Sequence, residues 1–132
     1  MNLKFFLLLA VALLPARAYA QSTDAPPYSI QLYLCMGETD GTDAATLDCL
    51  LREFRYQDSR INGTYQSLLG GLPLAKRPAL QRVQNLWWRY RDANCRLLRD
   101  TASDDRIGAI AQLNCMMDMT ARRADDLESQ LP

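Results

Sequence analysis

One stretch of the chain restricts its possible folds more than any other. Residues 84–95 contain both tryptophans, two arginines and a cysteine, and neither glycine nor proline interrupts them. One face of a helix would carry Leu80, Val83 or Gln84, Trp87, Arg91, and Asn94 or Cys95, because these residues recur at steps of three and four. That face is mostly apolar, yet its guanidinium and amide groups can be buried only beside hydrogen-bonding partners. The stretch therefore predicts a central helix packed against neighbouring helices.

Turn signals divide the chain into three long helices. The first is predicted from about Asp43 to Leu69, the second from residues 75–78 to Asp100, and the third from residues 103–105 to about Ser129. Thr42 is a suitable N-cap for the first helix, and the Gly-Gly-Leu-Pro sequence of residues 70–73 ends it. The connecting loops are short, which favours antiparallel neighbours. The expected fold class is all-α: a small antiparallel three-helix bundle, with up to four helices, stapled by two disulfides.

The beginning of the chain is predicted to lie outside this bundle. Residues 1–20 have a basic start, a ten-residue apolar run and the small-x-small site Ala18-Tyr19-Ala20, as a secretory signal peptide does. Cleavage would leave Gln21 first, where a lipoprotein would have cysteine. Residues 21–34 are predicted to be a flexible arm, and the alternation in residues 28–34 fits an extended arm or a short helix laid on the core. Residues 35–132 would form one helical domain, periplasmic or secreted.

Cysteine and histidine usage excludes several kinds of site. The chain has four cysteines, Cys35, Cys49, Cys95 and Cys115, and no histidine. An even number of cysteines in a small exported chain indicates two disulfides. Three connectivities are possible, and we predict the local one, Cys35 with Cys49 and Cys95 with Cys115. Zinc sites built on cysteine and histidine, and nucleophilic catalysis with a histidine base, are excluded. We therefore predict no cofactor, no metal and no enzymatic activity.

The charge balance also restricts the partners. The chain has 15 basic and 15 acidic side chains, and loss of Lys4 and Arg17 with the signal peptide leaves a small negative charge. Nucleic acids and anionic membranes recruit basic surfaces. We therefore expect no nucleic-acid partner. Because no second apolar run long enough to span a bilayer is present, we also expect no stable membrane anchor after signal cleavage.

Asp58 stands where the first helix should be apolar. The seam of that helix alternates steps of four and three residues through Leu47, Leu51, Phe54, Asp58, Ile61, Tyr65 and Leu68. Either the helix kinks and Asp58 reaches water, or Asp58 is partly buried and paired with Arg91 or Arg123. We favour the pair, whose loss in Asp58→Ala would cost on the order of 3 kcal/mol or more. The predicted structural network comprises Asp58, Asn62, Tyr65, Gln84, Trp87, Arg91, Thr120 and Arg123.

Four motifs occur in a defined order: Cys35 and Cys49; Asp58-x-x-Ile61-Asn62-x-x-Tyr65-x-x-Leu68; Gln84-x-x-Trp87-x-x-x-Arg91-Asp92-x-x-Cys95; and Cys115-x4-Thr120-x-x-Arg123-x3-Leu127. Together they resemble the LprI-like lysozyme-inhibitor domain of exported bacterial proteins. The resemblance covers nearly all of the chain after the signal peptide. It implies a helical domain outside the cytoplasm that binds lysozyme and blocks its action on peptidoglycan. The motif residues lie mostly on predicted core faces, so they indicate a shared fold more than a shared binding surface.

The contact surface has to be sought elsewhere. Arg89, Arg96 and Arg99 on the exposed side of the central helix are candidates for partner binding, as are loop residues 36–43. The alternative function is a non-enzymatic envelope adaptor that binds another exported protein through the methionines of residues 116–119, which core filling would also explain. An enzyme that acts through carboxylates is the weakest hypothesis, because the acids of residues 125–128 resemble a solvated face.

Overall fold

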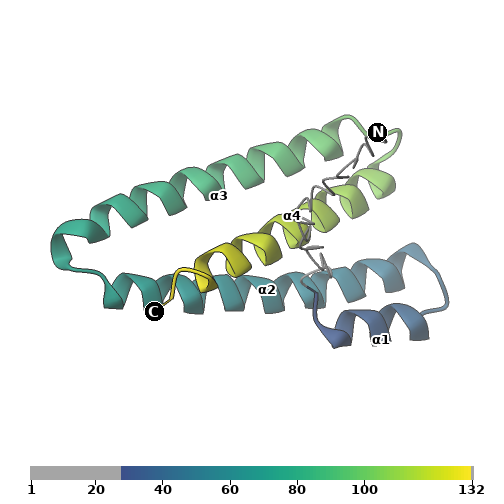
Figure 1. Ribbon diagram of the computed structural model, residues 1–132. Helices are drawn as coiled ribbons and strands as arrows, with labels where there is room; N and C mark the ends of the chain where they lie inside the picture. Colours follow the sequence, from purple (N-terminus) through teal and green to yellow (C-terminus); the bar gives the residue numbers. More distant parts are fainter. Residues whose placement is uncertain (1–27, 132) are drawn as a thin grey trace, which may run out of the picture.

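The structure is a computed structural model, and it describes residues 28–131. This part of the chain contains α1 (Ile30–Glu38), α2 (Asp43–Gly71), the short 3-10 turn η1 (Leu74–Lys76), α3 (Arg77–Asp100) and α4 (Asp105–Glu128). Successive long helices run in opposite directions (Figure 1). No strand occurs within residues 28–131. The predicted all-α antiparallel bundle is confirmed, with four helices.

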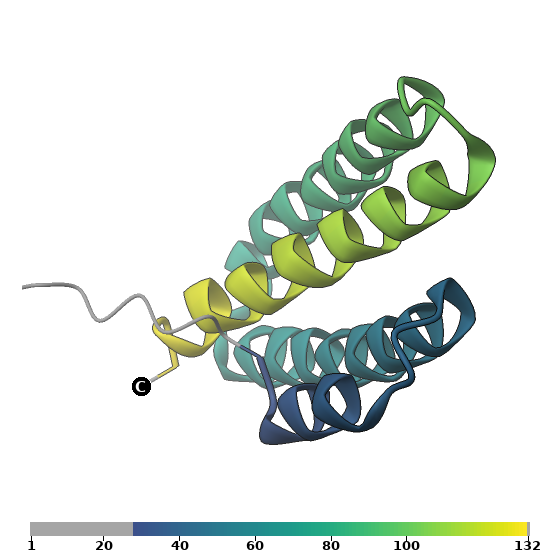
Figure 2. The same ribbon diagram turned by 90° about the vertical axis from the view of Figure 1, so that its right-hand side faces the viewer.

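Helix α4 is the centre of the arrangement. It packs against α2 on one side and α3 on the other, and both views show it between these two helices (Figures 1 and 2). Helix α1 lies along the first half of α2, away from α3. Helices α2 and α3 meet through long side chains, as where the rings of Tyr65 and Trp88 pack edge to face with centroids 5.9 Å apart.

Local capping explains where the helices begin. The Thr42 hydroxyl accepts a hydrogen bond from the Ala45 amide at 3.3 Å, as predicted for the start of α2. At the start of α4, the Asp104 carboxylate accepts from the amides of Arg106 and Ile107, both at 2.9 Å. Asp104 is therefore the N-cap, within the range of residues 103–105 predicted for the start of this helix. A carboxylate there also interacts favourably with the helix dipole.

The predicted arm over residues 21–34 is wrong from residue 30 onward. These residues begin α1, whose N-cap is Ser29 and whose Leu32 side chain is only 7% exposed. The short helix laid on the core was the other possibility left open. A nine-residue helix is marginal alone, and burial of Leu32 against α2 and α4 stabilises it. The domain therefore begins before Cys35. The predicted signal peptide and its cleavage site lie outside the described residues.

Two apolar clusters fill the bundle. One, near the α2–α3 connection, contains Ile61, Tyr65, Leu68, Ala124 and Leu127, with Leu69, Leu80, Trp87 and Trp88 packed against it. The other joins α1, α2 and α4 and contains Leu32, Cys49, Leu50 and Met117, with Tyr28, Cys35, Phe54, Ile110 and Leu113 around it. Helix α3 contributes only partly buried residues to the first cluster.

Two disulfides connect neighbouring helices. Cys35 pairs with Cys49 and joins α1 to α2, and Cys95 pairs with Cys115 and joins α3 to α4. The structure therefore contains the local pairing. Among residues 28–131, no helix has the length and apolar character needed to cross a membrane.

Candidate functional site

The inner face of α3 places Arg91 between three helices. Its side chain is 9% exposed, and its Nη1 donates to the Thr120 hydroxyl on α4 at 3.1 Å. Its Nε and Nη2 donate to one oxygen of Asp92 at 2.9 and 2.8 Å. The guanidinium carbon lies 5.4 Å from the ring centroid of Trp87 and 5.8 Å from that of Phe54. The charge is thus neutralised by the next residue and its flat faces contact aromatic rings.

Asp58 is partly buried and lies within ion-pair distance of Arg91, as the sequence suggested, but the pair is not shielded from solvent. Its carboxylate is 43% exposed, and its nearer oxygen is 3.9 Å from Nη1 of Arg91, too far for a hydrogen bond. Asn62 donates to its other oxygen at 3.2 Å. Helix α2 continues through this point without a break. Asp92 accepts the two short hydrogen bonds from Arg91 instead. It is adjacent in sequence on the same helix, whereas Asp58 would have to reach Arg91 from α2.

Gln84 and Arg123 form a separate contact between α3 and α4. The Arg123 Nε donates to the Gln84 side-chain oxygen at 3.2 Å. The Gln84 side chain is fully buried, and its Nε2 has no hydrogen-bond partner among the described residues. The expected single network is therefore two groups, one around Arg91 and one around Gln84. Tyr65 belongs to neither, since its ring packs against Trp88 in the apolar cluster.

The buried polar residues of α2 are ones that the heptad pattern missed. In its first half the buried positions include Leu50, Glu53 and Gln57 rather than Leu51 and Asp58. Glu53, 3% exposed, accepts hydrogen bonds from the backbone amide of Ser29 at 2.9 Å and from Gln57 Nε2 at 2.7 Å. The Ser29 hydroxyl also donates to it. Glu53 thus holds the start of α1 on α2.

A second missed group links α2 to α4. Arg60 forms ion pairs with Asp125 and Glu128, and its Nε lies 2.7 Å from Oε1 of Glu128. These acids were expected to be a solvated face. Hydrogen bonds from Arg60 hold the pKa of Glu128 below its ordinary value, and the same contacts raise the pKa of Arg60. The only sequence signal for these ion pairs was an arginine one helical turn before Thr64, on a half-buried face.

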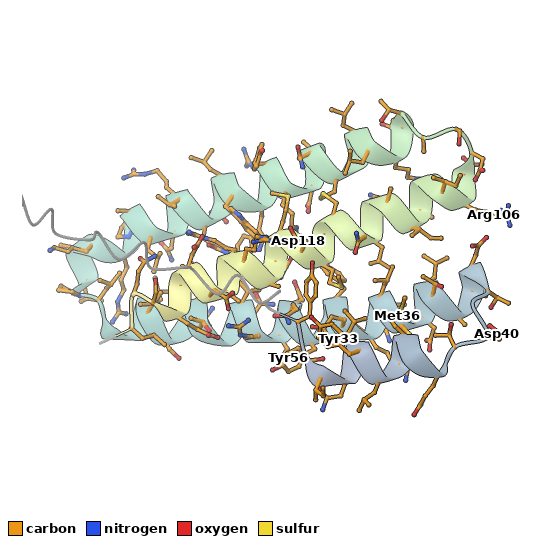
Figure 3. All side chains as sticks on the ribbon, turned by 45° about the vertical axis from the view of Figure 1, so that its right-hand side comes forward. Tyr33, Met36, Asp40, Tyr56, Arg106 and Asp118 are labelled. Carbon is orange, nitrogen blue, oxygen red and sulfur yellow. A yellow bond between two sulfur atoms is a disulfide. The ribbon has the colours of Figure 1, made fainter. Side chains whose placement is uncertain are left out.

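The segment before α1 is held by Tyr28. Its hydroxyl donates to Asp118 on α4 at 2.8 Å, and Asp118 also pairs with Arg122 (Asp118 is labelled in Figure 3). Burial, followed by this hydrogen bond, raises the pKa of Tyr28 to about 12. The tyrosine contributes to holding the first described residues near the middle of α4.

The predicted partner-binding arginines lie on the outer side of α3. Arg89 and Arg96 are exposed, and Arg99 is exposed but donates to Gln112 on α4 at 3.2 Å. Sequence reasoning missed Arg82, which extends the spacing of Arg89 and Arg96 by seven residues. It also missed the exposed apolar residues beside them, for which the same seven-residue period was the available signal.

Of the other two candidate surfaces, the loop of residues 36–43 is exposed and the methionine face is largely internal. Residues 39–42 fold around Asp40, whose carboxylate accepts from the Thr42 amide at 3.0 Å. That hydrogen bond, with one from the Thr42 hydroxyl, lowers the pKa of Asp40. Met117 is 1% exposed and belongs to the core, so the methionine face proposed for an adaptor is largely internal. Residues 28–131 contain no cluster of three or more cysteine, aspartate or glutamate side chains suited to hold a metal ion.

Comparison with known proteins adds the family. A model of the lysozyme inhibitor LprI family matches residues 35–127, which include both disulfides, the Arg91 group and the Gln84–Arg123 pair. The chain belongs to the LprI lysozyme inhibitor family. No curated protein and no solved structure matches it. Both disulfides of this chain fit an oxidising environment outside the cytoplasm.

Proposed function

We propose that this protein is exported and inhibits lysozyme by binding it. The observation that carries the proposal is the match of the LprI lysozyme inhibitor family to residues 35–127, nearly the whole described part of the chain. The two disulfides support an extracytoplasmic site of action. The leader-like residues 1–20 support export through cleavage after Ala20.

Inhibition of this kind requires a rigid surface more than a reactive group. Lysozyme cuts its polysaccharide substrate between a pair of carboxyl groups, and a protein that occupies the cleft excludes the substrate. Helices joined by disulfides present such a surface with little entropy left to lose on binding. We therefore propose a binding protein without catalytic activity of its own, whose partner is lysozyme.

The test is a turbidity assay on bacterial cells with purified protein that begins at Gln21. We expect the oxidised protein to slow lysis at micromolar concentration, and the reduced protein to slow it less, because a small core depends on its disulfides. Activity of the same lysozyme on a small soluble oligosaccharide would show whether its cleft is blocked. No inhibition of either animal-type or goose-type lysozyme would contradict the proposal and favour an envelope adaptor of the same fold.

Export is tested separately. The proposal predicts that the protein recovered from outside the cytoplasm begins at Gln21. N-terminal sequencing that finds Met1 on the exported protein would contradict the predicted cleavage.

A further inference from the structure

The outer side of α3 carries an apolar stripe on which no other part of residues 28–131 packs. Val83, Leu86, Tyr90 and Leu97 are 52%, 64%, 62% and 59% exposed. They recur at steps of three, four and seven residues, and Ala93 occupies the place between the last two. Such spacing aligns side chains along one helical face, as in the contact seam of a coiled coil. At about 1.5 Å per residue, the stripe from Val83 to Leu97 is about 21 Å long.

A row of arginines runs beside this stripe. Arg82, Arg89 and Arg96 are exposed, follow one another at seven-residue steps, and each directly precedes a residue of the stripe. None of the three forms a hydrogen bond or an ion pair with another residue of the described chain. Arg91, which points to the inner side of the same helix, is fully engaged. The stripe and the three arginines together are called the α3 outer face.

We propose that the α3 outer face is the surface that docks on lysozyme, with α3 lying along a groove that has apolar walls and carboxylates. This inference rests on the proposed function. Anchors at i, i+3 and i+7 are the pattern by which an amphipathic helix enters a groove. Exposed tyrosine and arginine are the side chains most often responsible for binding energy. Free guanidinium groups suit the carboxylate pair that a lysozyme cleft contains.

A second copy of this chain is a poorer occupant of the same face. If two α3 helices packed antiparallel through their stripes, the flanking arginine rows would face each other, and juxtaposed like charges are unfavourable. A partner with acidic side chains would instead be attracted to the arginine row, and this attraction would also raise the association rate. Charge therefore selects a partner with carboxylates over self-association.

A second exposed apolar face, on α1, has no row of unpaired arginines beside it within residues 28–131. Tyr33, Leu34 and Met36 of α1 are 48%, 57% and 43% exposed, and lie on the α1–α2 side of the molecule, away from α3 (Figure 3 labels Tyr33 and Met36). Arg52, which contacts Cys35 of this helix, already pairs with Asp48 at 2.8 Å. This face supplies a matched control.

The experiment compares variants of the two faces in the lysozyme assay with oxidised protein. Arg89→Glu and Tyr90→Gln change the α3 outer face. The controls are Tyr33→Gln on the α1 face and Arg55→Glu, which changes an exposed arginine of α2. Circular dichroism and thermal melting check the fold of each variant. We expect each α3 variant to raise the inhibitor concentration for half-inhibition about tenfold or more, and the controls to change it less than about twofold. The defect of Arg89→Glu should shrink as salt rises.

The possible outcomes separate the two proposals. If the unaltered protein inhibits and the folded α3 variants inhibit equally well, the docking surface is refuted while lysozyme inhibition stands. Equal losses in controls and α3 variants also refute it. If the unaltered protein does not inhibit, both proposals fail. Sedimentation that shows a dimer broken by Tyr90→Gln would assign the α3 outer face to a second copy and overturn the inference.

Discussion

Helix α4 is held by different means on its two sides. Against α2 it packs through buried apolar residues such as Ile61 and Leu127, reinforced by the partly buried ion pairs of Arg60. Against α3 it is held by the Cys95–Cys115 disulfide, by buried polar side chains and by partly buried apolar residues such as Trp87. The buried residues of α3 are Gln84, Arg91 and Cys95, so no aliphatic or aromatic residue of α3 is fully buried.

The difference has consequences for how each contact fails. Apolar burial resists a change of pH or of redox state, but the carboxylates that pair with Arg60 lose their charge in acid. The α3 contact has no carboxylate from α4 but depends on a covalent bond that reduction breaks. Of the two sides of α4, we therefore expect reduction to loosen the α3 contact first and acid to weaken the α2 contact first.

The largest expected effect is the loss of the α3–α4 disulfide. Cys95 and Cys115 are separated by 20 positions, and opening a loop of that size costs about 3 kcal/mol by the chain-entropy model. Urea denaturation of the Cys95→Ala/Cys115→Ala protein should show this loss in the free energy of unfolding, with little dependence on pH between 4 and 8. The Cys35→Ala/Cys49→Ala protein is the comparison, because loss of the Cys35–Cys49 disulfide should release α1 instead. A change well under about 1 kcal/mol for Cys95→Ala/Cys115→Ala would contradict the account.

The second-largest loss of unfolding free energy is expected for Arg91→Ala. It removes the hydrogen bond to Thr120 and the packing on Phe54 and Trp87, and we expect a loss of about 2 kcal/mol in unfolding free energy. Arg89→Ala, on the opposite side of the same helix, should change it by less than about 0.5 kcal/mol. Equal effects of the two substitutions would show that the inner and outer sides of α3 do not differ in the way described.

Gly108 tests how closely α4 approaches α3. A Cβ built there would lie 2.9 Å from the backbone oxygen of Arg99, and that oxygen cannot move freely. Gly108→Ala should therefore lower the unfolding free energy by about 1–2 kcal/mol, despite the better helix propensity of alanine. Gly63→Ala in the middle of α2 meets nothing within 4 Å and should be stabilising. If both substitutions stabilise, the close approach is absent in solution.

Acid should weaken the contact between α4 and α2, where Arg60 pairs with Glu128. Because Arg60 lowers the pKa of Glu128 from 4.5 in the folded protein, the pair contributes stability above the unfolded pKa, and this is lost as pH falls through the lower folded value. The contribution is modest, since Glu128 is 39% exposed. Thermal melting from pH 7 to pH 3 should fall less steeply in Glu128→Gln than in the unaltered protein. Parallel curves for the two proteins would argue against the pair.

The smallest effect is expected at Asp58. The sequence suggested a cost on the order of 3 kcal/mol for Asp58→Ala, on the assumption of a shielded pair. With the carboxylate 43% exposed and 3.9 Å from Arg91, the expected loss is about 0.5–1 kcal/mol. Asp92→Ala, which removes two hydrogen bonds from Arg91, should cost more. A denaturation series in which Asp58→Ala exceeds Asp92→Ala would restore the original hypothesis.

The sequence by itself determined the elements, because the signals involved are local. Helical periodicity, Thr42 and the Gly-Gly-Leu-Pro break placed α2 and α3 within a few residues, and the order of motifs indicated the family. The cysteines allowed three pairings, and the predicted local one is present. The sequence also identified Arg91 as a charge that needs partners, since a guanidinium on an apolar face cannot be buried without them.

Only the tertiary structure decided which partners those are. An α-helix of 3.6 residues per turn drifts about 20° per heptad from a strict seven-residue seam, and α1 covers the first half of α2. Burial therefore falls on Glu53 and Gln57 there, while Asp58 stays half exposed. The partners of Arg60 and Arg91 depend on how neighbouring helices are rotated and spaced. No periodicity within one helix contains that information.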